Sequence, residues 1–530
     1  MNNKYDAIII GAGHNGLTCA GYLAKAGKNV LVLEKRYLVG GATVSEEIVP
    51  GYKFATFSYL VSLLRSEVIH DLELVKHGLR MLPFETTLDL AANGDYLYRE
   101  PDHYRTYRAI ARYSKRDAEA YDEYKLMMRH VIHTVRYLMH HAPPNMDVDA
   151  NPLALVELAK HLGTVDKEVL YTLIQLLTIS ANDFLSQWFE TDILKAGLAT
   201  SGMIGSMVSP KSPGSGLVLL AMYMGEIDGV YRTWRFAKGG TGGVANALAR
   251  AAQAFGADIR TNAPVAQLLR HGDEVRGVVL ESGEEITADL VVSSLTPQMT
   301  YLKLAGEEGL PSDLVEQVKR WNSAGSASKI NLALDGIPEF KAMPGFGMHL
   351  AGGFNTNVSI DAFERLYDTA KYGDFERHLF IDGGIISFAD PDMAPPGKHV
   401  MTCFVMYTPY HLRQGTWDER REELGDAVVD TLEHYIPNIR KLIVGRQIST
   451  PLDIERLINM SGGNIFQGEL RLSQMFLMRP TAGYSGYQTP LHNYYICGSS
   501  AHPSGGISGA PGRLAALQIL QQKWGVGRGE

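Results

Sequence analysis

Cysteine is scarce in this chain. Only Cys19, Cys403 and Cys497 occur among 530 residues, and they are widely spaced and odd in number. No pair has the C-x-x-C spacing of a dithiol redox centre, and no cysteine belongs to a zinc-binding pattern. The sequence therefore gives no basis for disulfide exchange or a metal site, and free thiols in a reducing compartment are expected.

Long apolar runs and basic blocks are also lacking. No run reaches the roughly 18 apolar residues that a membrane-spanning helix needs. The formal net charge is −8, which argues against nucleic acid as a partner. The first predicted strand begins at Tyr5 and leaves no room for a targeting segment. We expect a cytoplasmic protein; peripheral membrane contact and an oligomeric state both stay open.

The composition, with 45% apolar and 20% charged residues, is that of a globular protein whose length calls for two domains. Tyr5–Gly11 reads as a continuous apolar strand, followed by a helix over His14–Ala26 and a second strand over Asn29–Glu34. Uninterrupted apolar strands are typical of a parallel sheet that is buried on both faces.

The pattern changes further along the chain. A long helix is predicted over Arg105–His141, and α/β character returns from Gly239. Strands follow at 265–269, 274–280 and 285–288, then a separate apolar strand at Ala288–Ser293. One α/β domain is therefore assembled from separated pieces, and the two inserts between them form another domain.

The first chemical motif is Gly11-Ala12-Gly13-His14-Asn15-Gly16, which has the form G-x-G-x-x-G. It follows a strand, opens a helix and is followed by an acid, Glu34, at the end of the next strand, which is the context of a dinucleotide site. Gly11 allows the tight turn, Gly13 lets the pyrophosphate approach, and Gly16 lets the helix pack on the strand. Glu34 would accept hydrogen bonds from the adenosine ribose.

The paired glycines Gly40 and Gly41 favour FAD over NAD. With Glu34 and Lys35 they form an E-K-x-x-x-x-G-G pattern, which resembles the second part of the fingerprint of glutathione-reductase-like flavoproteins. The run Gly239–Gly243 also opens a helix, but its flanks lack the strand and the distal acid of an NAD site. It is interpreted as a helix start or a loop against the flavin.

Together with these motifs, the stretch Tyr495–Ala516 resembles the phytoene desaturase and carotenoid isomerase branch of the flavin amine oxidase superfamily. Within that branch the chain is most similar to the subgroup called pyridine nucleotide-disulphide oxidoreductase domain-containing protein 2. Further matching stretches are Pro50–Phe54, Ser58–Arg65, Ser212–Leu220, Ser328–Leu334 and Gly462–Leu470.

The resemblance implies an α/β fold: a glutathione-reductase-like FAD-binding Rossmann domain made of discontinuous segments, plus an α+β substrate domain with a helical insert. The FAD-binding domain would comprise residues 1–100, 236–310 and 458–530. The substrate domain would comprise a helical part, 101–235, and a sheet part, 311–457.

The resemblance also places residues at the cofactor. Gly498 and Ser499 would lie at the pyrophosphate and ribityl, while Gly505, Gly506 and Ile507 would press on the flavin ring. Val265 matches the position whose backbone meets the adenine. Ala42 stands where many amine oxidases have an arginine, so one contact to the cofactor must be replaced.

Two residues are candidates for catalysis. Lys329 lies in a strand pattern, where many amine oxidases have a lysine that holds a water against the flavin; the alternative is an edge-strand lysine that reaches solvent. His502 lies in the predicted flavin loop; the alternative is a loop histidine whose hydrogen bonds are satisfied within the protein and that has no catalytic role. The histidines His130 and His133 share a helix face without an acidic ligand, so no metal is expected.

These features predict an FAD-dependent oxidoreductase that acts on C–H bonds of an apolar small molecule, not a carotenoid, with oxygen or a quinone as electron acceptor. A redox-neutral isomerase, an amine oxidase and a flavin-binding scaffold protein are the alternatives. The methionines that would line a hydrophobic tunnel, or else form plain core, are Met127, Met128, Met203, Met207, Met222 and Met224.

Overall fold

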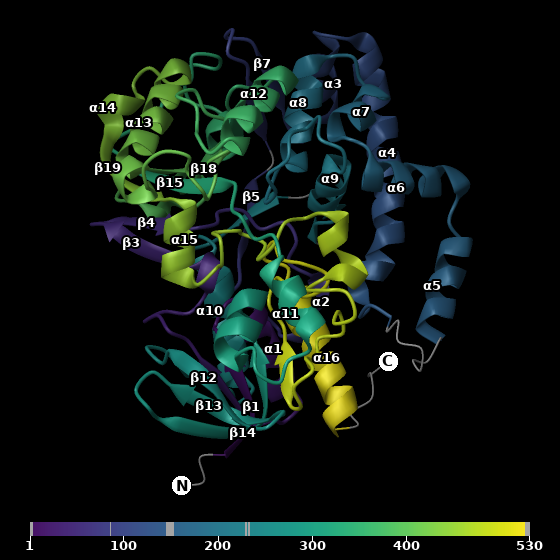
Figure 1. Cartoon of the computed structure of the whole chain (residues 1–530). Helices are drawn as coiled ribbons and strands as arrows, with labels where there is room; N and C mark the ends of the chain where they lie inside the picture. Colours follow the sequence, from purple (N-terminus) through teal and green to yellow (C-terminus); the bar gives the residue numbers. More distant parts are fainter. Residues whose placement is uncertain (1–3, 85, 145–152, 228–229, 232–233, 525–530) are drawn as a thin grey trace.

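The computed structural model describes residues 4–84, 86–144, 153–227, 230–231 and 234–524 (Figure 1). Its first sheet has the order β11-β2-β1-β14-β13-β12, and β20 also pairs with β14. The strands are β1 (Lys4–Ile10), β2 (Val30–Leu33), β11 (Asp258–Arg260), β12 (Val265–His271), β13 (Glu274–Leu280), β14 (Glu285–Ser293) and β20 (Tyr494–Ile496). Strands β11, β2, β1, β14 and β20 are parallel, so three distant segments build one Rossmann-like sheet.

The sequence interpretation was wrong about one strand. The segments 285–288 and 288–293, expected as two strands, form the single strand β14. Its first three residues pair with β13 and its last three with β20, while most of its length pairs with β1. A change of partner along the strand, and no break in the backbone, explains the two apparent segments.

Both faces of the first sheet are covered. Ile9 packs towards α1 (His14–Lys25), α10 (Gly242–Ala254) and α16 (Ala510–Trp524). Ile8 packs on the opposite side with apolar residues of β12 and β13 and of the π-helical segment Gln298–Ala305. This double burial explains why β1 is continuously apolar.

The second sheet has the order β19-β15-β18-β17-β16-β6-β7. Its strands are β6 (Thr87–Leu90), β7 (Tyr96–Arg99), β15 (Ala327–Leu334), β16 (Gly353–Asn355), β17 (Ile381–Ile385), β18 (His399–Met406) and β19 (Ile443–Ser449). One face packs on α13 (Trp417–Tyr435). Strands β6 and β7, which lie within the first predicted segment, thus pair in the other sheet.

The helices between residues 103 and 223 form a layer beside the two sheets (Figure 1). They are α3 (His103–Ala111), α4 (Lys115–His140), α5 (Leu153–Gly163), α6 (Lys167–Thr178), α7 (Ala181–Ser186), α8 (Asp192–Ala199) and α9 (Ser215–Tyr223). The helix predicted over 105–141 is two helices, because the Ser114 hydroxyl accepts a hydrogen bond from the amide of Asp117 and caps a new helix.

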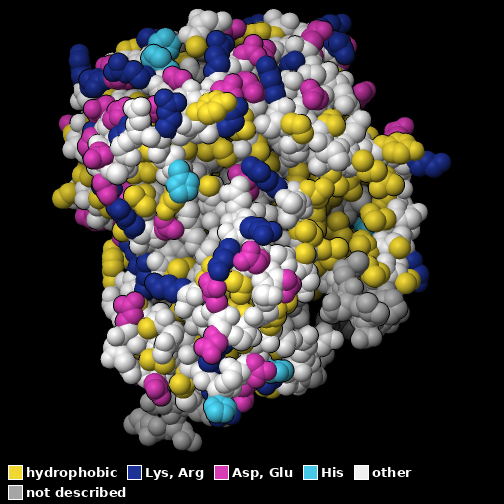
Figure 2. Space-filling model, viewed as in Figure 1, with side chains coloured by type: hydrophobic (Ala, Val, Ile, Leu, Met, Phe, Trp, Pro, Cys, Tyr) yellow, Lys and Arg dark blue, Asp and Glu magenta, His cyan; other side chains and the backbone are white. Residues whose placement is uncertain are grey.

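Shorter elements complete the fold: α2 (Ser66–Asp71), α11 (Ser312–Lys319), α12 (Ile360–Lys371), α14 (Ile439–Leu442), α15 (Pro451–Ile458), and the hairpins or ribbons β3 (Ser45–Val49) with β4 (Tyr52–Ala55), β5 (Met81–Phe84) with β10 (Trp234–Ala237), and β8 (Glu226–Ile227) with β9 (Val230–Tyr231). In the described part of the chain, no helix combines the length and apolarity needed to cross a bilayer. Figure 2 shows apolar side chains gathered over α4, α5 and α6, where Leu126, Val156 and Ile174 are exposed.

Candidate active site

A cleft of about 1050 Å³ lies beyond the carboxyl ends of β1 and β2. This is where ligands bind in open parallel sheets. Most of the residues predicted from the glycine motifs and from the family resemblance to bind the cofactor line it, namely Gly11, Gly13, Gly16, Glu34, Lys35, Gly41, Ala42, Val265 and Ser499. Segments that are far apart in the sequence therefore meet in one cavity.

The three glycines of the first motif differ in what surrounds them. A Cβ built on Gly16 would lie 2.2 Å from the Gly11 carbonyl oxygen, so α1 can approach β1 only without that side chain. Gly11 has φ +93°, a backbone conformation that favours glycine. A Cβ on Gly13 would have no neighbour within 4 Å, because this glycine faces the cleft. The cleft therefore offers open space at the place where a pyrophosphate would approach.

Two buried polar atoms at the start of α1 have no partner in the described structure. They are Nε2 of His14 and Oδ1 of Asn15, and both residues line the cleft. Burial lowers the pKa of His14 to about 4, so its imidazole is neutral. The Asn15 amide donates to the Ser499 hydroxyl at 3.1 Å. A helix start with free N–H groups and unpartnered polar atoms fits a bound dinucleotide.

Glu34 also lines the cleft, and backbone amides hold its carboxylate. Its Oε2 accepts a hydrogen bond from the Ala12 amide at 2.9 Å, and its Oε1 accepts one from the Arg36 amide at 2.9 Å. Each carboxylate oxygen keeps acceptor capacity for a ligand hydroxyl. Lys35 instead donates to the Asn459 side chain at 2.7 Å, linking β2 to the end of α15.

The paired glycines lie against the first motif. The Gly40 amide donates to the Ala12 carbonyl at 2.8 Å, and Gly40 forms an isolated bridge with Gly13. Gly40 and Gly41 have φ of +130° and +56°. A Cβ on Gly41 would lie 3.4 Å from the Gly13 Cα, so the two glycine motifs form one surface.

Residues of the C-terminal loop line three different cavities. Ser499 lines the dinucleotide cleft, whereas Gly498 is packed under it, 2.5 Å from the Ser294 carbonyl oxygen measured from a built Cβ. Gly506 and Ile507 line a second, apolar cavity, and Gly505 lines a small third one. The fully buried guanidinium of Arg479 donates to the Ser499 carbonyl and fixes this loop.

The apolar cavity, of about 870 Å³, adjoins the cleft. The two share His14, Ala42, Ile458, Met460 and Ile465. Further wall residues of the apolar cavity are Phe57, Tyr59, Leu60, Leu63, Ile204, Met222, Trp234, Asp382, Phe404, Ile454 and Phe466. A group that leaves the cleft past Ala42 therefore enters an apolar space.

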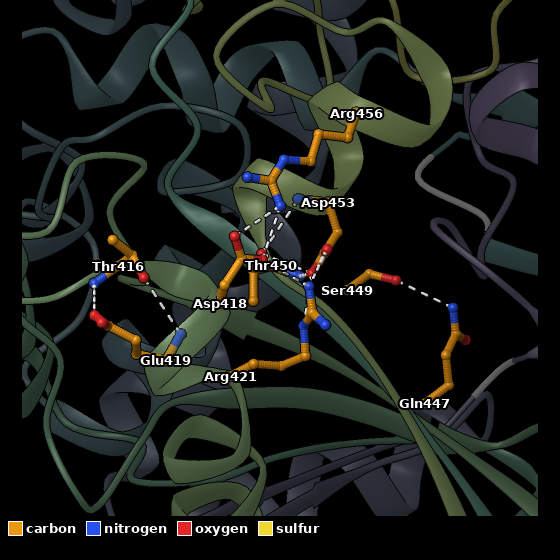
Figure 3. A network of polar contacts seen from close by, with 9 residues as sticks. All are labelled: Thr416, Asp418, Glu419, Arg421, Gln447, Ser449, Thr450, Asp453 and Arg456. Atoms are coloured by element: carbon orange, nitrogen blue, oxygen red, sulfur yellow. Dashed lines mark hydrogen bonds and ion pairs between the residues drawn. The ribbon is translucent and has the colours of Figure 1, made fainter.

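A polar network fixes α15, whose Ile454 and Ile458 line this space (Figure 3). Thr450 and Asp453 form a capping box at the start of α15. Asp453 also pairs with Arg421 of α13, and Arg456 pairs with Asp418 at 2.8 Å. These contacts hold α15, and with it the apolar wall, against α13, which packs on the second sheet.

The structure places Lys329 and His502 outside both cavity walls. The Lys329 ammonium donates to the Ala55 carbonyl at 3.2 Å, to Asn331 at 2.6 Å and to Thr402. It lies 5.6 Å from the centre of the Tyr59 ring. Burial lowers the pKa of Lys329 to about 7.

His502 is buried, and its Nε2 donates to the Leu138 carbonyl, 2.8 Å away. Burial lowers the pKa of His502 to about 4, so its imidazole is neutral. The run Gly239–Gly243 opens α10, and none of its glycines lines either cavity. Of the predicted tunnel methionines, Met222 lines the apolar cavity and Met224 the small adjoining one, while Met128 and Met203 lie in the core.

Sequence reasoning missed Tyr59 and Asp382 on the wall of the apolar cavity. Asp382 stands alone as a charged residue in the run Leu379–Phe388, which is otherwise apolar apart from glycines and a serine. An acidic residue inside an apolar strand is rarely buried without a binding partner or a functional role. The sequence alone could therefore have marked Asp382 as a candidate site residue. Within the described ranges, no three His, Cys, Asp or Glu side chains gather as a metal would require.

Comparisons with known proteins agree with this geometry. Residues 198–447 match the model of the flavin containing amine oxidoreductases, and residues 9–71 match an NAD(P)-binding Rossmann-like domain. Pyridine nucleotide-disulfide oxidoreductase domain-containing protein 2 of Rattus norvegicus is 38% identical, over 98% of this chain and 94% of its own length.

More distant relatives share the same full-length match. A limonene dehydrogenase chain of Castellaniella defragrans is 27% identical over 97% of this chain and 94% of its own length. A phytoene desaturase of Neurospora crassa is 25% identical over 97% of this chain and 84% of its own length. These matches confirm the resemblance that the sequence motifs indicate.

A solved structure of a putrescine oxidase triple mutant superposes with a TM-score of 0.62, at 17% identity, over 98% of this chain and 99% of that one. At this identity the likeness concerns the fold, and it confirms the predicted fold class. The cofactor is FAD, and the chain is an FAD-dependent oxidoreductase that belongs to the family of flavin containing amine oxidoreductases, alongside pyridine nucleotide-disulfide oxidoreductase domain-containing protein 2.

Proposed function

We propose that this oxidoreductase dehydrogenates a C–H bond of an apolar small molecule that is not a carotenoid. The observation that carries the proposal is that the two cavities lie next to each other and share His14 and Ala42 on their walls. A substrate in the apolar cavity would lie next to the end of a dinucleotide held in the cleft. The relationship to a limonene dehydrogenase chain supports both the reaction and the apolar substrate.

In this reaction the protein binds and orients the substrate and excludes water from it. When bound, FAD supplies the hydride-accepting chemistry. Phe404, Phe466 and Met222 surround the substrate space with apolar surface and exclude water from it. A volume of about 870 Å³ falls within the range of small-molecule pockets, roughly 300–1,000 Å³.

An anaerobic titration of the purified yellow protein tests the reaction. We expect limonene, as an apolar probe, to bleach the flavin absorbance, and benzylamine and phytoene to leave it unchanged. Bleaching by benzylamine alone would identify an amine oxidase. Conversion of a polyene without net bleaching would identify an isomerase, and a colourless protein would overturn the assignment of FAD.

The acceptor and the setting are part of the same proposal. Oxygen or a quinone would reoxidise the flavin. If oxygen is the acceptor, the oxidised spectrum returns in air and hydrogen peroxide is formed. If a quinone is the acceptor, the spectrum returns only when a soluble ubiquinone analogue is added. The three cysteines are free and buried, which supports a cytoplasmic setting. Peripheral membrane contact or oligomer formation would use the exposed apolar face of α4–α6.

A further inference from the structure

The apolar cavity does not end in an apolar wall. A polar cleft of about 1560 Å³ adjoins it, and the two share Leu60, Ile204, Trp234 and Asp382. The apolar cavity therefore begins beside the dinucleotide cleft at Ala42 and reaches, at Asp382, a space lined by charged residues. Asp382 is the only acid among the four shared residues, and it belongs to β17.

Asp382 has an incomplete set of partners. The Tyr59 hydroxyl forms a hydrogen bond with it, and no cation of the described chain forms an ion pair with it. Burial raises the pKa of Asp382 to about 7, against the opposing effect of the Tyr59 hydrogen bond. A carboxyl group in such a place is costly to ionise without a donor or a cation beside it.

The neighbouring charges do not serve as that partner. Asp89 lies nearby, but Arg99 binds it at 2.7 Å and Asn355 donates to it at 2.8 Å, so this pair is internally neutral. Lys329 lies across the Tyr59 ring and gives its hydrogens to Ala55, Asn331 and Thr402. The acceptor capacity of Asp382 that Tyr59 does not use therefore faces the two cavities.

We propose that the substrate is amphipathic: its apolar body fills the cavity between Ala42 and Phe404, and its far end carries a hydrogen-bond donor that binds Asp382. A hydroxyl or a protonated amine has this chemistry, whereas a carboxylate would meet Asp382 with repulsion and a methyl group would leave it without a partner. The inference rests on the proposed function, because it names the class of molecule that the same cavity takes.

Four probes with one p-menthadiene body test the recognition: limonene, perillyl alcohol, perillyl amine and perillic acid end in a methyl, hydroxyl, ammonium or carboxylate group. Dissociation constants are measured under anaerobic conditions: from the saturation of the rate of flavin bleaching with probe concentration for a probe that reduces the flavin, and from flavin difference spectra for a probe that does not. We expect at least one of the two donor probes to bind about tenfold or more tightly than both limonene and perillic acid, since one added hydrogen bond to a carboxylate contributes about that much.

Variants of Asp382 separate the two donors. Asp382→Asn keeps an acceptor and removes the charge, so it would weaken an ammonium about tenfold and a hydroxyl less than threefold. Asp382→Ala would weaken either donor about tenfold while leaving limonene unchanged. Glu100→Gln, a change on the polar cleft away from the apolar cavity, is the matched control and should leave all four constants unchanged.

Equal binding of all four probes, or donor probes unaffected by both Asp382 variants, would overturn the inference. FAD absorbance and the melting temperature of each variant show that folding and cofactor loading are intact. The failure of the proposed function looks different: the wild-type protein would lack FAD, or no apolar probe would reduce it. A holoenzyme that limonene reduces, with no preference for donors, refutes only the role of Asp382.

Discussion

Gly512 at the start of α16 lies directly against the main-chain carbonyl of Asn15 in α1. A Cβ built on Gly512 would be 2.1 Å from that oxygen and 3.1 Å from the Cys19 amide nitrogen. Asn15 in turn binds the Ser499 hydroxyl in the dinucleotide cleft. The C-terminal helix therefore packs on α1 beside the cofactor site, and at Gly512 the two backbones approach so closely that no side chain can enter without displacing one helix.

We expect Gly512→Ala to destabilise the fold by about 1–3 kcal/mol, because overpacking forces backbone shifts of this cost. It should also weaken FAD binding, since Asn15 moves with α1. Urea unfolding and a fluorescence titration of the apoprotein with FAD measure the two effects. Gly486→Ala is the control, because its Cβ would meet nothing nearer than 4.0 Å; equal effects from both would refute the close contact.

Gly13 and Gly16 should separate cofactor binding from folding. Gly13 has φ −68° and an open Cβ position, so Gly13→Asp should change the free energy of unfolding by no more than about 0.5 kcal/mol. Its carboxylate would occupy the phosphate region and abolish FAD binding. Gly16→Ala, whose Cβ would lie 2.2 Å from the Gly11 carbonyl oxygen, should destabilise the fold. A Gly13→Asp protein that purifies with full flavin absorbance would contradict the site.

The parts of the fold that sequence predicted well are those whose signal is local. β1, α1 and β2 follow one another, and the turn glycines and Glu34 stand within thirty residues of one another. The pairing of β6 with β16 joins residues near 88 with residues near 354. No local pattern encodes such a partner, so residues 87–99 could not be assigned to the second sheet from their own sequence.

The site was predictable to the same extent. The glycine motifs predict the dinucleotide cleft. The apolar cavity, in contrast, is formed by single residues from separate parts of the chain, such as Tyr59, Ile204 and Phe404. Lys329 stood out as a buried strand lysine, yet the face it occupies depends on the pairing of β15 with β18 and β19. Which side chains reach a cavity is a property of packing that periodicity alone does not determine.

The network around α15 predicts an effect on substrate more than on cofactor. Asp453 caps α15 and pairs with Arg421, and its side chain is 12% exposed. Asp453→Ala should cost about 1–3 kcal/mol of stability, since it removes a cap and a partly buried ion pair. The wall formed by Ile454 and Ile458 should loosen, and KM should rise while FAD remains bound.

Steady-state kinetics and the flavin absorbance of the purified variant check this prediction. Asp430→Ala is the matched control on α13, because it breaks the exposed pair with Arg440 and touches no cavity wall. It should leave both KM and stability nearly unchanged. A loss of FAD from Asp453→Ala, with KM unaltered in the loaded fraction, would show that α15 supports the dinucleotide cleft, which Ile458 also lines, and not the substrate wall.

Lys329 makes the stability of the second sheet depend on pH. Burial lowers the pKa of its ammonium from 10.5 to about 7. Between these values the unfolded chain binds the proton and the folded chain does not, so the free energy of unfolding rises with pH across this window. Below about pH 7 both states are protonated, and the contribution is constant and unfavourable.

Lys329→Met removes this titration. The free energy of unfolding of the wild type, relative to that of Lys329→Met, should rise by on the order of 1 kcal/mol per pH unit between about pH 7 and 10 and stay flat below pH 6. Urea unfolding at a series of pH values measures the difference. Lys371→Met, at an exposed lysine paired with Asp368, should show no such slope. A flat difference for Lys329→Met would mean that the polar cage of Ala55, Asn331 and Thr402 keeps the ammonium charged throughout.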